Sequence, residues 1–228
     1  MLFAIDPAPL PTLPIKGRKQ GFPIHRVFCV GRNFTDHAAE MGAEVDREAP
    51  FYFTKSAHHV ALAEGRVPYA QRTQNYHHEL ELIVALGKEG TNVPVDQARE
   101  LIFAYTLGLD MTRRDLQAKA KDKRRPWDLA KDVEASALAA PLRPVADFGH
   151  QDHGSLSLKV NGDVRQLGDL ADMVWSVPEI IADLSTLYSL RAGDLIFMGT
   201  PAGVGPVQAG DRLEGFLGDE ALFEADIS

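Results

Sequence analysis

Two glutamates and an aspartate stand where their carboxylates could share a cation. Glu79 and Glu81 lie two residues apart at the start of the apolar run Ile83–Leu86, which is typical of a buried strand. Alternate side chains of a strand share one face, so both carboxylates point the same way. Like charges there are unfavourable unless a cation lies between them, and Mg²⁺ and Ca²⁺ prefer oxygen ligands. The alternative is an edge strand with two solvated glutamates.

A second apolar stretch ends in an acid and adds a third carboxylate. Residues 105–110 have a buried-strand pattern that ends at Asp110, and a helix is expected to begin directly after it. Asp110 or Thr112 is available as its N-cap. Arg114 and Gln117 are three residues apart, so they share one helical face. Three carboxylates beside a cationic and an amide side chain indicate a site rather than an ordinary surface.

A histidine and a glutamate at helical spacing could form a general-base pair. A short helix is expected from Thr35 or Asp36 to Gly42. Within it His37 and Glu40 are three residues apart and meet on one face. A histidine oriented by a carboxylate can take a proton from water. The alternative is an exposed His–Glu contact without a catalytic role.

Lys131 differs from the other lysines of the chain. The basic run 119–125 is typical of a solvated helix end. Lys131 instead follows the Pro126–Trp127 turn and enters a semi-apolar stretch, where a partly desolvated ammonium could stabilise a developing anion. Lys55 ends an aromatic strand at 51–55, and its spacing predicts nothing beyond a surface lysine.

The elements that must position these residues are mostly strands. A hairpin with an Asn161–Gly162 turn is expected near 156–165. A short helix is expected at 95–104. Further helical segments are expected to begin at Asp169 or Ser176 and to extend through Tyr188. The buried strand 194–198 leads into the loop 199–205, whose three glycines allow close approach of the backbone to a ligand. We expect an α+β fold, a mixed β-roll with a few peripheral helices, in which an extended arm (1–24) precedes one catalytic domain (25–228).

Composition excludes several classes of protein. The chain has 228 residues, of which 45% are hydrophobic, and a net charge of −8. The negative charge argues against nucleic-acid binding, and no apolar run approaches the roughly 20 residues of a membrane span. Cys29 is the only cysteine and lies in a strand pattern, so we expect a core thiol. A single cysteine and a start without signal-peptide features indicate the cytoplasm.

Five motifs together resemble the fumarylacetoacetate hydrolase family over roughly residues 24–226. They are Gly31-Arg-Asn-Phe-Thr-Asp-His-Ala-Ala-Glu40, His78-Glu-Leu-Glu81, Gly108-Leu-Asp-Met-Thr-Arg-Arg-Asp-Leu-Gln117, Lys131 after its tryptophan turn, and Gly199-Thr-Pro-Ala-Gly-Val-Gly205. Within the family the chain is most similar to fumarylpyruvate hydrolases and acylpyruvases. It departs from the family pattern at Ser56, where proline is common, and in residues 132–141 after Lys131, which leaves the choice of substrate open.

The resemblance implies a homodimeric, metal-dependent enzyme that acts on a small 2-oxo acid. It assigns Mg²⁺ or Mn²⁺ to Glu79, Glu81 and Asp110 and water activation to His37 and Glu40. It assigns the binding of the substrate and its oxyanion to Arg114, Gln117 and Lys131, with a further contact from Thr200. The implied reaction is hydrolysis of the C–C bond of an acylpyruvate, fumarylpyruvate giving fumarate and pyruvate. Alternatives are an oxaloacetate decarboxylase, a 2-oxo acid isomerase or hydratase, and a non-catalytic binding module.

Overall fold

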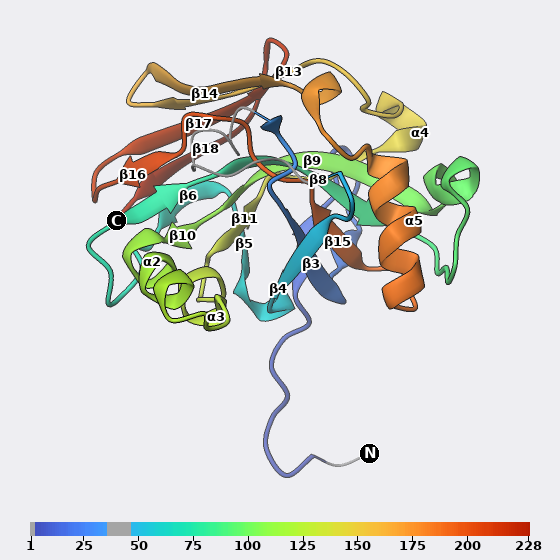
Figure 1. Cartoon of the computed structure of the whole chain (residues 1–228), viewed down its shortest axis with the longest axis horizontal. Helices are drawn as coiled ribbons and strands as arrows, with labels where there is room; N and C mark the ends of the chain where they lie inside the picture. The colour runs from blue at the N-terminus through green and yellow to red at the C-terminus, as the bar shows by residue number, and fades with distance from the viewer. Residues whose placement is uncertain (1–2, 36–46) are drawn as a thin grey trace.

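Two β-sheets of different size make up most of the molecule (Figure 1). The computed structural model describes residues 3–35 and 47–228. In the eight-stranded sheet the order is β4 (Phe51–Lys55), β3 (Arg26–Gly31), β15 (Asp194–Phe197), β8 (Leu80–Leu86), β9 (Ile102–Asp110), β11 (Ala137–Ala139) and β5 (Val60–Leu62), and β12 (Arg143–Pro144) pairs with β9. In the five-stranded sheet it is β14 (Asp163–Asp169), β13 (Ser155–Val160), β17 (Arg212–Leu217), β18 (Glu220–Ile227) and β6 (Glu64–Val67).

Two small sheets flank these. One contains β10 (Thr112–Arg113), β7 (Tyr76–His78) and β16 (Gly205–Val207), and the other is the hairpin of β1 (Thr12–Pro14) and β2 (Gly21–Pro23). The helices of the described chain are α2 (Arg114–Asp122), α3 (Asp128–Lys131), α4 (Val145–Phe148) and α5 (Val177–Leu187), with 3₁₀ turns η1 (Ala57–His59), η2 (Val95–Leu101) and η3 (Leu170–Asp172). The expected α+β class and mixed β-roll are confirmed.

Local signals located most elements, with one clear error. The Asn161–Gly162 turn joins β13 to β14, and both residues have positive φ, as a type I′ turn requires. Ser176 caps α5 and Asp169 caps η3, as expected. The helix expected at 95–104 is wrong in type and length. The 3₁₀ turn η2 ends at Leu101, and the residues that follow form β9, which pairs with β8. Along the described residues, no helix combines the length and apolarity that a membrane crossing needs.

The eight-stranded sheet buries both of its faces. On β8, Leu82 and Val84 face the core shared with the five-stranded sheet and α5, whereas Ile83 and Ala85 face a second core. The hairpin β1–β2 covers this second core. A strand with two buried faces reads as a continuous apolar run, which explains the sequence of β8. Cys29 is fully buried in the second core, and the core-thiol prediction is confirmed.

Candidate active site

The three carboxylates meet at one end of the pair β8–β9. Glu79 and Glu81 continue the face of β8 that carries Ile83, and Asp110 ends the neighbouring strand. The register places Glu81 opposite Gly108, so Asp110 lies close to both glutamates. Their ligand atoms lie within 4.8 Å of one another, and all three side chains are buried. A buried cluster of oxygen donors at this spacing fits a hard divalent cation.

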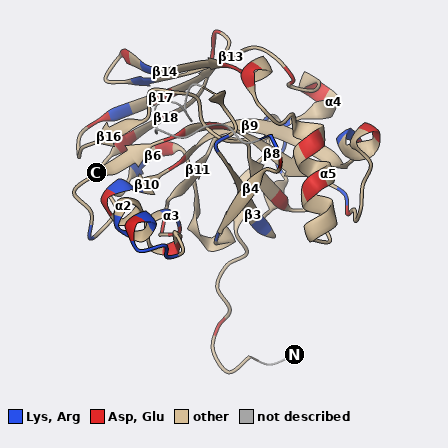
Figure 2. Ribbon diagram, viewed as in Figure 1, with Lys and Arg blue, Asp and Glu red and all other residues tan. Residues whose placement is uncertain are grey.

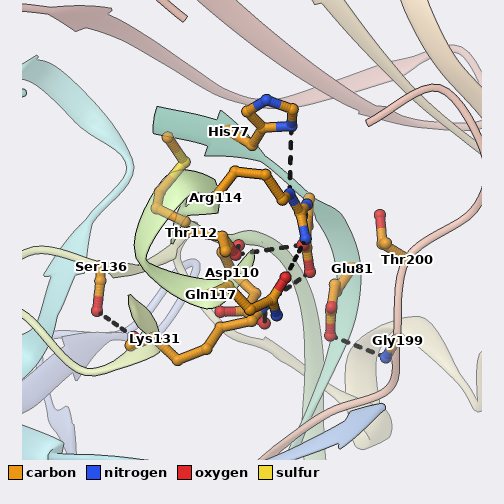
Figure 3. Close-up of polar contacts among 12 residues, drawn as sticks. His77, Glu81, Asp110, Thr112, Arg114, Gln117, Lys131, Ser136, Gly199 and Thr200 are labelled. Atoms are coloured by element: carbon orange, nitrogen blue, oxygen red, sulfur yellow. Dashed lines mark hydrogen bonds and ion pairs between the residues drawn. The ribbon is translucent and has the colours of Figure 1, made fainter. Parts of the chain in front are cut away.

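Two of the predicted site cations contact this cluster directly (Figure 3). The ammonium of Lys131 lies 2.8 Å from Glu79 Oε2 and 2.6 Å from Asp110 Oδ2, and Arg114 Nη2 lies 2.5 Å from Glu79 Oε1. Burial alone would lower the pKa of Lys131, but Asp110 and Glu79 outweigh it and raise the pKa. Lys131 is therefore a protonated, buried hydrogen-bond donor.

Lys55 is a third cation beside the cluster and is only 3% exposed, so its prediction as a surface lysine is wrong. Its ammonium lies 2.8 Å from Asp110 Oδ1. It also donates to the carbonyls of Met111 at 3.1 Å and Ser136 at 2.9 Å, and to that of Lys131. Strand β4 pairs with β3, which directs the end of this side chain under the site instead of into solvent. Lys55 shares a strand face with Phe51 and Phe53, but Phe51 is 38% exposed, so this local pattern does not reveal the burial of the lysine.

Glu81 is the carboxylate with the least support from cations. Burial, then Asp110 and Glu79, raises its pKa well above the usual value. Gly199 donates its backbone N–H to Glu81 Oε2 at 2.8 Å. Gly199 has φ of 91°, and a Cβ there would lie 2.8 Å from Asn33 Cβ, so only glycine brings this amide to the carboxylate without strain.

Helix α2 carries Arg114 and Gln117, as expected, although its N-cap was predicted wrongly. Arg114 Nη1 donates to Gln117 Oε1 at 2.7 Å. The N-cap is Arg113, without a side-chain capping bond. The candidate caps are used elsewhere, because Thr112 donates to Glu79 Oε1 at 3.2 Å and Asp110 binds the two lysines.

Arg114 also contacts a histidine beside the cluster. Its Nε donates to Nδ1 of His77 at 3.5 Å. Burial, followed by the charge of Arg114, lowers the pKa of His77 to about 4. The imidazole is therefore neutral at neutral pH and can accept this hydrogen bond.

A cavity of about 40 Å³ opens above the cluster. Its walls contain the predicted residues Glu79, Glu81, Asp110, Arg114, Gln117, Lys131 and Thr200. The walls also contain Phe51, Phe53, Trp127, Arg32 and Lys121. The predicted pair His37 and Glu40 lies outside the described residues. Strand pairing and helix placement thus bring together every predicted site residue within the described part of the chain.

Comparison with known proteins finds similar sequences over most of the chain. The model of the fumarylacetoacetate (FAA) hydrolase C-terminal family matches residues 26–226. A fumarylpyruvate hydrolase from Ralstonia sp. is 49% identical over 177 residues, which are 77% of this chain and 92% of the relative. Oxaloacetate tautomerase YcgM of Escherichia coli (strain K12) is 39% identical over 201 residues, 87% of this chain and 90% of the relative.

A crystal structure matches the fold over nearly its whole length. Fumarylpyruvate hydrolase from Pseudomonas aeruginosa, solved in complex with Mn²⁺ and pyruvate, superposes with a TM-score of 0.94 at 42% identity and covers 99% of each chain. With the match of the family model, this shows that the chain belongs to the fumarylacetoacetate hydrolase family.

Proposed function

We propose that this protein is a metal-dependent hydrolase that cleaves the C–C bond of acylpyruvates and converts fumarylpyruvate to fumarate and pyruvate. The observation that carries the proposal is the buried cluster of Glu79, Glu81 and Asp110, with the ammonium of Lys131 in contact with two of its members. The Ralstonia relative supports the substrate class. The Pseudomonas structure supports it further, because the pyruvate in that complex is one product of the proposed reaction.

The cluster would hold Mg²⁺ or Mn²⁺. Three carboxylates are hard donors without sulfur or imidazole, a set that suits these ions better than zinc or copper. When bound, the cation supplies Lewis-acid polarisation of the 2-oxo acid end of the substrate. Glu79, Glu81 and Asp110 are its proposed ligands.

The chain's own groups would perform the remaining tasks. The substrate-binding residues Arg114, Gln117 and Thr200 line the cavity and orient the substrate. His37, oriented by Glu40, takes a proton from water, and the resulting hydroxide adds to the C4 carbonyl. The protonated Lys131 stabilises the oxyanion that forms. The C3–C4 bond then breaks to give fumarate and the enolate of pyruvate, and the proton that His37 took from water passes to C3 to complete pyruvate.

Absorbance of the substrate enol provides the test. Purified protein should consume fumarylpyruvate with Mn²⁺ or Mg²⁺, release fumarate and pyruvate, and stop with EDTA. Glu81→Gln should lower kcat/KM by about 100-fold or more, because it removes a ligand of the Lewis acid. The matched control is Glu89→Gln, an exposed glutamate beyond the end of β8 that should leave the rate unchanged. A folded Glu81→Gln protein with wild-type rate would refute the proposal.

A second candidate is tautomerisation of oxaloacetate at the same site, and the Escherichia coli relative favours it. Keto–enol exchange needs no hydroxide addition. Decarboxylation of oxaloacetate needs neither hydroxide addition nor a base, so His37→Ala should abolish cleavage of fumarylpyruvate in the hydrolase but leave most of the activity of an oxaloacetate decarboxylase. Turnover of oxaloacetate without cleavage of fumarylpyruvate would select this alternative.

The proposal includes a cytoplasmic homodimer that acts in the breakdown of aromatic compounds. The lone, buried Cys29 suits a reducing compartment. Sedimentation equilibrium should give twice the chain mass of 25.0 kDa.

A further inference from the structure

The cavity of the candidate site has a buried inner end and an exposed mouth. The carboxylates and Lys131 at the inner end are at most 5% exposed. Arg32 and Lys121 also line the cavity, but both are exposed. A substrate whose pyruvyl end reaches the carboxylates must therefore extend its acyl end toward Arg32 and Lys121.

These two cations differ from the others that line the cavity. Lys131 and Arg114 are paired with carboxylates of the cluster. Within residues 3–35 and 47–228, neither Arg32 nor Lys121 has an ion pair. Figure 2 shows the basic segments that gather along α2, where Lys121 lies, and along the turn toward α3. The mouth of the cavity thus carries two positive charges without an acidic partner in the described structure.

Each of these cations lies over an aromatic ring. The guanidinium carbon of Arg32 is 5.7 Å from the ring centroid of Phe51, and the ammonium of Lys121 is 5.1 Å from that of Trp127. The two rings contact each other edge to face, with centroids 5.7 Å apart. Both rings line the cavity. A flat, conjugated acyl chain could pack against them, with a terminal anion between the two cations.

The backbone holds Arg32 in place. Arg32 has φ of 59°, in the left-handed region that non-glycine residues seldom adopt. The next residue, Asn33, is fully buried, donates to the carbonyls of Trp175 and Met198 and accepts from the Trp175 amide. These bonds offset the conformational strain, which is of order 1 kcal/mol. An unfavourable backbone conformation held by its neighbours often marks a functional position.

Electrostatics at Lys121 favours an anionic ligand. Burial, then the charges of Arg114 and Arg32, lowers its pKa. An anion beside Lys121 would relieve this repulsion. Other arginines near the site are less suitable, since Arg113 donates to the Leu129 carbonyl and Arg125 lines neighbouring hollows outside this cavity.

We propose that Arg32 and Lys121 form a subsite for a carboxylate at the distal end of the acyl group, so that the enzyme selects dicarboxylate acylpyruvates over acetylpyruvate. The inference rests on the proposed function and adds its substrate specificity. The aromatic pair at the mouth would select a flat acyl chain, and the two cations would select its terminal charge.

Single charge-removing variants test the subsite. Arg32→Gln and Lys121→Gln should each lower kcat/KM for fumarylpyruvate by about 10- to 100-fold, the range of a lost charge-assisted hydrogen bond. For acetylpyruvate, which has no distal carboxylate, the change should stay below about threefold. Lys123→Gln is the matched control, an exposed lysine two residues further along that does not line this cavity. It should alter neither value.

Binding of fumarate and of crotonate, which share a four-carbon chain but differ by one carboxylate, separates the subsite from the reaction. Calorimetry with Mn²⁺ should show fumarate bound at least about tenfold more tightly than crotonate by the wild type, with the ratio falling toward one in both variants. Equal losses on both acylpyruvates, or an unchanged fumarate-to-crotonate ratio, would overturn the subsite. A wild type that cleaves no acylpyruvate refutes the proposed function, and the binding ratio still decides the subsite.

Discussion

At the scale of single residues, charge balance explains how three carboxylates can be buried together. Burying an unpaired carboxylate is strongly unfavourable. Here the three acids lie beside three cations, which are Lys55, Lys131 and Arg114. Lys55 has no side-chain exposure and contacts the Asp110 oxygen that faces away from Lys131. Lys55 therefore helps to orient Asp110, whose other oxygen contacts Lys131.

Removal of Lys55 should destabilise the protein strongly. Lys55→Met leaves Asp110 Oδ1 buried without its cation and three carbonyls without a shared donor. The free energy of unfolding in urea should fall by about 3–5 kcal/mol, as for other broken buried ion pairs. Lys88→Met, at an exposed lysine, should change it by less than about 0.5 kcal/mol. A loss below about 1 kcal/mol in Lys55→Met would show that Asp110 does not depend on this contact.

At the scale of elements, α5 has the most complete local stabilisation in the described chain. Ser176 and Glu179 form a reciprocal capping box, and Pro178 lies in the first turn. The apolar side of α5 packs into the main core through Ile180 and Leu184. Hydrogen bonds from Ser176 lower the pKa of Glu179 below its ordinary value of 4.5. The cap therefore couples the stability of this helix to pH.

Loss of the cap should have a pH-dependent effect. Because the folded pKa of Glu179 is depressed, its stabilisation is present above pH 4.5 and is lost as the pH falls through the folded value. Ser176→Ala should cost about 1 kcal/mol at pH 7 and less at about pH 3.5, where the carboxylate is increasingly protonated in the wild type too. Urea unfolding at both pH values measures this. Thr186→Ala, at an exposed position of α5, should show no such pH dependence, and equal losses at both pH values for Ser176→Ala would contradict the prediction.

At the scale of the whole molecule, the large sheet needs a cover on each face. The five-stranded sheet and α5 cover one face, and the hairpin β1–β2 covers the second core. Phe22 is 6% exposed and stacks on Phe103, with ring centroids 5.5 Å apart. The face of β8 that packs against the hairpin also carries Glu81. The hairpin therefore covers the apolar part of the face on which the site lies.

A substitution in this hairpin should therefore act like a core mutation. Phe22→Ala should lower the free energy of unfolding by about 3–5 kcal/mol, because a buried aromatic side chain is lost. Phe3→Ala provides the control, since Phe3 is 65% exposed and should contribute less than about 0.5 kcal/mol. Similar urea midpoints for the two variants would mean that the hairpin contributes little to the fold.

Local signals in the sequence determined the features that depend on a few neighbouring residues. The two-residue repeat placed Glu79 and Glu81 on one face, and the three-residue spacing joined Arg114 to Gln117. Capping and turn chemistry located Ser176 and Asn161. Each signal follows from the geometry of one strand, helix or turn, which the backbone imposes whatever lies around it.

Tertiary structure alone decided which distant segments meet. The register of β8 and β9 brings Asp110 to the glutamates, and the pairing of β4 with β3 carries Lys55 beneath them. Lys121 belongs to a run typical of a solvated helix end, yet the packing of α2 and α3 places it at the mouth of the cavity. No local pattern encodes these positions, because burial and the pairing of charges depend on contacts between residues far apart in the chain.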